Sequence, residues 1–130
     1  MDLGDSAAAD LIVQDSDTAQ ALALATGDSF PNVFATARMI ALMEVAASRL
    51  MKPILQEGEL SVGVTVNVTH SAPTPIGARV QARATYLGKD GKLFRFRVEA
   101  EDEAGPIGNG EHLRAIISVE RLTATAAKRK

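Results

Sequence analysis

A single carboxylate, that of Glu44, interrupts the most apolar stretch of the chain, residues 31–51. Apolar and small side chains recur there every three or four residues, as on one face of a helix. Glu44 follows Ile40 by four residues and precedes Ala47 by three, so it belongs to that apolar face. An unpaired buried carboxylate costs several kcal/mol or takes up a proton instead. Glu44 is therefore either half of an ion pair, for example with an arginine of the same helix, or a group with a chemical role.

Two other polar residues, Thr36 and His70, are candidates for a role beside Glu44. Thr36 lies two turns before Glu44 and roughly 80° around the helix, so its hydroxyl can reach the same cleft or bond to its own backbone. His70 ends a strand in which every second residue is Val, and it starts from the core side if that strand has no bulge. A His titrates near neutral pH, which suits proton transfer, although a lone His at a strand end is more often structural. His112 has no evident partner in the sequence, and we interpret it as structural.

The composition excludes several classes of function. The chain has no Cys, hence no thiol nucleophile and no disulfide, and no G-x-S-x-G motif that would carry a nucleophilic serine. Its two His are far apart and lack Cys partners, so no metal-ligand spacing is present. With 14 basic and 16 acidic residues, one Tyr and no Trp, it shows no bias toward nucleic acid. No apolar run approaches the ~20 residues of a membrane span and no signal peptide is evident, so we expect a soluble cytoplasmic protein.

The 130 residues suit a single domain, whose predicted elements must position these side chains. A short strand begins at Leu11, the long helix covers residues 31–51, and four strands follow at residues 61–70, 78–87, 93–100 and 107–122. Residues 1–10 and 123–130 are expected to be flexible tails. A run of strands beside one segregated helix predicts an α+β fold with an antiparallel sheet. A sheet of this kind, wrapped around one long central helix, resembles the hot-dog fold.

Three segments of the chain are similar to the hot-dog acyl-CoA thioesterases of the fluoroacetyl-CoA thioesterase-like group. They are FPNVFATARMIALMEVAASRLM, SVGVTVNVTHSAPTPIGARV and GNGEHLRAIISVERL, within about residues 30–122. The elements V-F-A-T, L-M-E and V-T-H-x-A-x-T-P-x-G come in the family's order and spacing. The resemblance implies hydrolysis of a small acyl-CoA thioester to free acid and CoA. It implies no cofactor, because CoA is part of the substrate.

The resemblance also implies roles for individual residues. In that family a Thr and a Glu on the central helix and a His after the second strand act on the thioester. The residues that match them here are Thr36, Glu44 and His70. The residues that match the family's substrate contacts are Gly63, Arg114 and Phe30. Members of the family are homodimers with two sites at the subunit interface, and the His faces the partner's helix.

One departure from the family concerns a lid over the acyl group. The prototype of the group has a second phenylalanine three residues before the one that matches Phe30, and this chain has Gly27 there. Selectivity for a fluoroacetyl group is therefore not expected.

The chemistry that the resemblance implies can follow two routes. Glu44 attacks the thioester carbonyl or acts as a base on water, and His70 orients or deprotonates that water. Two alternatives stay open: a non-catalytic acyl-CoA-binding domain, or a hot-dog dehydratase or hydratase. The latter chemistry wants an Asp–His pair, and no Asp lies near His70 in the sequence.

Overall fold

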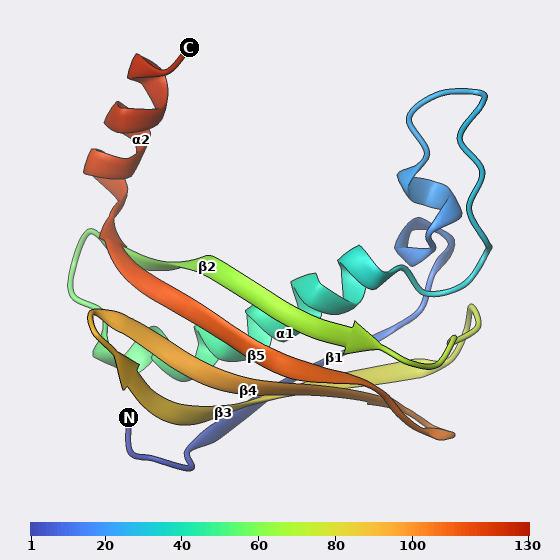
Figure 1. The fold of residues 1–130 in the computed structure, drawn as a ribbon, viewed down its shortest axis with the longest axis horizontal. Coiled ribbons are helices and arrows are strands. Elements are labelled where there is room, and N and C mark those ends of the chain that lie inside the picture. The colour runs from blue at the N-terminus through green and yellow to red at the C-terminus, as the bar shows by residue number, and fades with distance from the viewer.

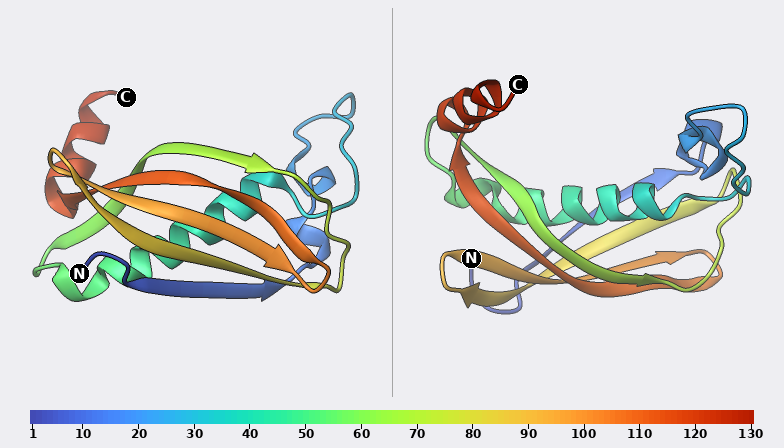
Figure 2. Two further views of the ribbon diagram at one scale, coloured as in Figure 1. Left: turned by 60° about the horizontal axis from the view of Figure 1, so that its bottom comes forward. Right: turned by 45° about the horizontal axis from the view of Figure 1, so that its top comes forward.

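A computed structural model describes all of residues 1–130 as a five-stranded antiparallel sheet curled around one long helix (Figures 1 and 2). The elements are β1 (Ser6–Ile12), η1 (Asp15–Asp17), η2 (Gln20–Leu22), α1 (Thr36–Met51), η3 (Lys52–Ile54), β2 (Glu59–His70), β3 (Arg79–Asp90), β4 (Leu93–Asp102), β5 (Gly105–Ser118) and α2 (Val119–Lys128). The strand order β1-β3-β4-β5-β2 leaves β1 and β2 as the two edges of the sheet. The predicted α+β architecture, with an antiparallel sheet around a central helix, is confirmed.

The core lies between α1 and the face of the sheet that curls toward it. Every second residue of β3 and β4 points into it, and the small alanines let the helix approach closely. The buried side chains of the two strands are Val80, Ala82, Ala84, Tyr86, Phe96, Val98 and Ala100. Those of the helix are Met39, Leu42, Met43, Ala46, Ala47 and Met51. Neither helix is long and apolar enough to cross a lipid bilayer.

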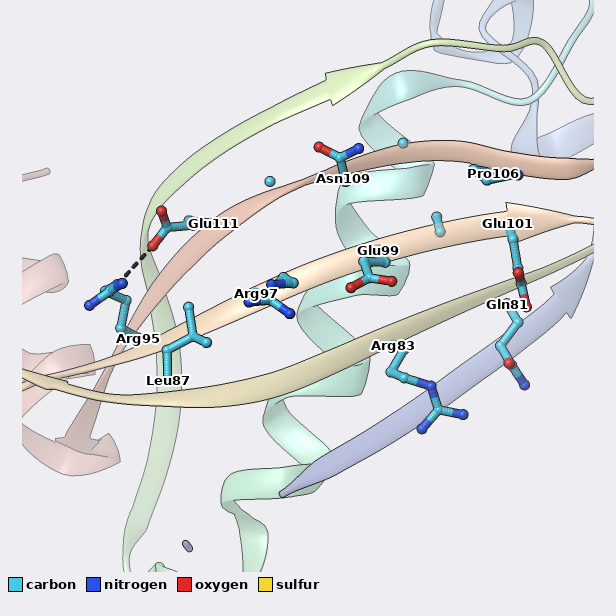
Figure 3. A pocket seen from close by; sticks show the side chains of 13 residues that line it. Gln81, Arg83, Leu87, Arg95, Arg97, Glu99, Glu101, Pro106, Asn109 and Glu111 are labelled. Carbon is cyan, nitrogen blue, oxygen red and sulfur yellow. Dashed lines mark hydrogen bonds and ion pairs between the residues drawn. The ribbon is translucent and has the colours of Figure 1, made fainter. Parts of the chain in front are cut away.

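The opposite face of the sheet is polar and carries an open hollow of about 770 Å³ (Figure 3). Its charges compensate one another across neighbouring strands. Arg83 lies opposite Glu99 in the register, and Arg97 lies opposite Glu111. Arg95 makes an ion pair with Glu111 at 2.7 Å. This hollow is on the far side of the sheet from α1, and we interpret it as a solvated surface.

The N-terminal residues are not the flexible tail that their composition predicts. Residues 6–12 form β1, which pairs with β3 along its whole length. Ala9 is 2% exposed, because small side chains on this strand pack beneath the helix. An Ala-rich, acidic segment is a weak strand former alone, and its pairing with β3 is a tertiary effect.

The long helix begins at Thr36, five residues later than the Pro31-Asn32 pair predicts. The backbone N–H of Phe34 donates to the Thr74 carbonyl, and that of Ala35 donates to the Asp17 carbonyl. These tertiary hydrogen bonds hold the preceding residues extended. Thr36 therefore sits in the first turn, where its hydroxyl is free to contact another element.

The C-terminal prediction is also wrong. The last strand ends at Ser118, not at residue 122, and residues 119–128 form a second helix, α2, instead of a flexible tail. The Ser118 hydroxyl accepts from the N–H of Arg121 at 3.3 Å, which is an N-cap interaction. Val119 and the isoleucines before it favour strand, but the Ser118 cap ends the strand.

Strand β2 contains a β-bulge that the alternating valines do not reveal. Gly63 pairs with Arg114 and Thr65 pairs with Leu113, so Val64 is an extra residue in the ladder. The bulge reverses which residues face α1, because faces alternate along a strand. Gly63 faces the helix before the bulge, whereas Val66 and His70 face it afterwards. The valines before and after the bulge therefore face opposite sides of the sheet, and His70 faces α1 although the strand is bulged.

Candidate active site

Thr36 and His70 meet at one end of α1. The Thr36 Oγ1 atom lies 2.8 Å from His70 Nδ1, and both residues line an open pocket of about 290 Å³. The other ring nitrogen, His70 Nε2, is buried and has no hydrogen-bond partner in the chain. Buried polar atoms are normally paired, so this nitrogen is available to a group that the single chain does not supply.

Glu44 is held from the sheet by Arg114. The Arg114 Nη1 atom lies 3.3 Å from Glu44 Oε2, and the two side chains are 5% and 40% exposed, respectively. Arg114 also donates from Nε to the Ser61 hydroxyl at 3.0 Å and from Nη2 to the Ser61 carbonyl at 2.9 Å. Burial lowers the pKa of Arg114, and the charge of Glu44 acts in the opposite direction. A fixed cation thus orients a more accessible carboxylate.

The ion-pair interpretation of Glu44 is right in kind, but its expected partner is wrong. The partner comes from β5, 70 residues further along the chain, and not from an arginine of α1. Arg38 of the helix pairs instead with Asp17 at 2.9 Å. Arg49 donates to the Ala8 carbonyl at 3.1 Å. Only the register of the sheet could reveal the contact with Arg114.

His112 has two partners, so its interpretation as an isolated structural residue missed a network. Its side chain is 1% exposed. Its Nδ1 atom lies 2.9 Å from the Thr65 carbonyl, and its Nε2 atom lies 3.1 Å from Arg114 Nη1. A carbonyl only accepts, so Nδ1–H donates to it and Nε2 accepts from Arg114, which is the pattern of a neutral ring. Burial lowers the pKa of His112, more than the Thr65 hydrogen bond raises it.

Gly63 gives Glu44 and His112 the room that they occupy. A Cβ atom on Gly63 would lie 2.9 Å from Glu44 Oε2 and 3.1 Å from His112 Cε1. Any side chain there would displace the carboxylate. The present position of the carboxylate thus depends on glycine here, and strand glycines often mark such close approach.

The predicted site residues form two groups within one chain. Thr36 contacts His70, whereas Glu44 contacts Arg114 and lies against Gly63. Thr36 and Glu44 are eight residues apart on α1, which is about 12 Å along the helix axis. Phe30 is 48% exposed and does not line the pocket beside His70. No three His, Cys, Asp or Glu side chains gather as metal ligands do.

Two residues that contact Arg114, His112 and Ser61, were not predicted from the sequence to belong to the site. The one available signal was the spacing of His112 and Arg114, two residues apart and hence on one face of a strand. Their burial was not evident, because β5 alternates less clearly than β3 and β4.

Comparisons with known proteins agree in pointing to one family. The profile of the family described as fluoroacetyl-CoA-specific thioesterase matches residues 13–120. The fluoroacetyl-CoA thioesterase of Streptantibioticus cattleyicolor is 44% identical over 95 residues, which are 73% of this chain and 68% of that protein. A solved structure of the fluoroacetyl-CoA thioesterase FlK superposes with a TM-score of 0.91 and 36% identity, over 100% of this chain and 98% of the other. The structure of a thioesterase superfamily member from Thermus thermophilus superposes with a TM-score of 0.87 and 28% identity, over 98% of this chain and 91% of the other.

Proposed function

Because the chain belongs to the family of fluoroacetyl-CoA-specific thioesterases and is a thioester hydrolase of the hot-dog fold, we propose that it hydrolyses a small acyl-CoA to the free acid and CoA. Glu44 is the central group of the reaction. It either attacks the thioester carbon or takes a proton from the water that does. In both routes oxygen adds to the carbonyl carbon, the C–S bond breaks, and CoA leaves as a thiol after taking up one proton. If Glu44 is the nucleophile, the product of this step is a mixed anhydride, and water then hydrolyses it to the free acid and the original carboxylate.

The observation that carries this proposal is the setting of the Glu44 carboxylate. It is partly exposed, oriented by a buried guanidinium, and faces a strand residue without a side chain. An acyl group can approach such a carboxylate closely. The carboxylate itself fills the space over Gly63, and its 40% exposure leaves its outer part accessible to a substrate.

His70 and Thr36 assist in the proposed reaction. The unpaired His70 Nε2 is a suitable site for holding the attacking water or for passing a proton to the departing thiol. The Thr36 hydroxyl fixes the ring through Nδ1. Backbone N–H groups beside the thioester stabilise the oxyanion, a contribution typically worth about a hundred- to a thousandfold in rate for each donor.

We further propose that the active form is a symmetric dimer joined along β2. This edge strand exposes Leu60, Val64 and Val66 by 56%, 53% and 39%, and its outer backbone groups are unpaired. The unpaired N–H and C=O groups of such an edge are a template for pairing with another chain. Antiparallel pairing of two such edges lets the Thr36–His70 pair of one copy approach the Glu44 of the other. The dimer would then unite groups that lie about 12 Å apart along α1 of one chain.

The experiment that tests the activity is release of CoA thiol from a panel of acyl-CoAs. We expect thiol to appear with short acyl groups. Binding without thiol release would identify a non-catalytic acyl-CoA-binding domain. A change in enoyl-CoA absorbance without thiol release would identify a hydratase or dehydratase, although the polar contact of His70 is with Thr36 and not with an Asp. Light scattering at micromolar concentration tests the assembly, and a monomer there contradicts the shared site.

A further inference from the structure

The C-terminal helix α2 is not supported by its own chain. It leaves the end of β5 and projects beyond the open edge of the sheet (Figures 1 and 2). None of its ten residues is buried, and its first N–H donates to the Gly58 carbonyl at 3.0 Å. Isolated helices of fewer than about 12 residues are marginal in water, and protein helices depend on packing of an apolar face. A stable α2 therefore needs a surface from outside this chain.

The surface of α2 indicates what that partner must offer. Val119, Leu122 and Ala126 follow one another at helical spacing, and the first two are 36% and 45% exposed. Between residues 119 and 130 there is one acidic residue, Glu120, and the basic residues are Arg121, Lys128, Arg129 and Lys130. The partner surface should thus expose apolar side chains and be acidic.

The chain itself carries such a surface at the other end of β2. We call residues 14–35, which include η1 and η2, the N-terminal lobe. Its exposed acidic residues are Asp15 and Asp28, and it has no Lys or Arg; its third acidic residue, Asp17, is buried and paired with Arg38. It also exposes Leu22 by 43%, Leu24 by 95% and Phe30 by 48%. Like α2, the N-terminal lobe extends past the β2 edge, but at the opposite end (Figure 1).

A two-fold axis through the paired β2 edges brings these two surfaces together. Rotation by 180° places the N-terminal lobe of the second copy beside α2 of the first. By symmetry, α2 of the second copy lies beside the N-terminal lobe of the first. We propose that α2 docks on the N-terminal lobe of a second copy, an inference that rests on the proposed dimer. Because the lobe borders the Thr36–His70 pocket, α2 then forms one wall of the second copy's site.

The absence of Cys makes this proposal testable by cross-linking in the full-length protein. Leu122→Cys and Leu24→Cys single variants are mixed, allowed to exchange subunits, and treated with a short bismaleimide. We expect a covalent dimer containing one chain of each kind. A matched mixture of Leu122→Cys with Leu3→Cys should give little covalent dimer of this kind. Leu3 is 73% exposed, so a Cys there can react with the bismaleimide, but it belongs to neither proposed surface.

Hydrogen exchange and an edge control separate failure of this proposal from failure of the dimer. A Val66→Cys variant reports on pairing of the β2 edges by cross-linking to itself. In a protein that forms this edge dimer, the amides of residues 122–128 should exchange about tenfold or more slowly than after dilution to monomer. Edge cross-linking together with unprotected α2 amides and no Leu122–Leu24 product would overturn the proposal. Loss of the edge cross-link as well would refute the dimer itself.

Discussion

Replacing Gly63 with Ala should displace the Glu44 carboxylate without unfolding the protein. The added Cβ would lie 2.9 Å from Glu44 Oε2, and ordinary contact begins at 3.4 Å, so the carboxylate must move by about 0.5 Å (3.4 − 2.9). Its contact with Arg114, already 3.3 Å long, is then lost or distorted. A misplacement of about 1 Å can cost about a hundredfold in rate, so we expect kcat/KM of Gly63→Ala to fall roughly ten- to a hundredfold.

The folding free energy should respond differently. Gly63 does not have a positive φ, so Ala fits the backbone there and typically stabilises by about 0.4–1 kcal/mol through the unfolded chain. This gain offsets the cost of moving a flexible side chain, and the urea midpoint should change little. In a Glu44→Ala background the clash with the carboxylate is absent, so Gly63→Ala should be more stabilising there. Unchanged kcat/KM in Gly63→Ala, or equal stability effects in both backgrounds, would refute the contact as the cause.

Three further predictions concern the two His and the acyl group. Burial lowers the pKa of His112 below 6.5, so below that pH the unfolded chain binds more protons than the folded chain does. The free energy of unfolding is therefore highest above pH 6.5, and it decreases as the pH falls through the pKa of His112 in the folded protein. His112→Gln can keep both hydrogen bonds, and its urea midpoint should change less between pH 7 and pH 5 than that of the wild type. An equal pH dependence of the midpoint in both proteins would contradict this assignment. His70→Ala should lower kcat by about a hundred- to ten-thousandfold at unchanged thermal stability, and steady-state rates with wild-type activity would remove His70 from the reaction. Because Gly27 stands in place of a lid aromatic, the protein should hydrolyse several short acyl-CoAs without strong preference for fluoroacetyl over acetyl. A thousandfold preference in kcat/KM for fluoroacetyl-CoA, equivalent to about 4 kcal/mol, would show this expectation to be wrong.

Elements with a strong period could be predicted from the sequence. The helical period of α1 and the alternation in β3 and β4 gave the right fold class. The buried face of α1 is centred on Met39, Met43 and Ala46, however, and Glu44, expected on a buried stripe, is 40% exposed. The sequence predicted that Thr36 reaches the cleft of Glu44, whereas in one chain Thr36 contacts His70 and lies about 12 Å from Glu44 along α1. The structure groups Glu44 with Gly63 and Arg114, which the family resemblance named as substrate contacts.

The missed features depend on contacts between segments far apart in the chain. The bulge at Val64 leaves the valine spacing intact, so only pairing with β5 reveals that Gly63 faces α1. The same pairing brings His112 and Arg114 to Glu44. Tertiary hydrogen bonds to residues 34 and 35 delay the start of α1, and pairing with β3 turns the expected N-terminal tail into a strand. None of these contacts has a local signature.

The central claim is that the Glu44 carboxylate carries out the reaction, and Glu44→Gln tests it most directly. The amide keeps the shape of the side chain and an oxygen that can still accept from Arg114, but it is neither a nucleophile nor a base. Steady-state thiol release should show kcat lowered by roughly three orders of magnitude or more, while thermal melts and CoA binding of the same samples stay close to wild type. If Glu44 serves only as an ion-pair partner, the variant should instead lose stability and keep its turnover. A folded Glu44→Gln protein with a tenth or more of wild-type kcat would contradict the catalytic role of this carboxylate.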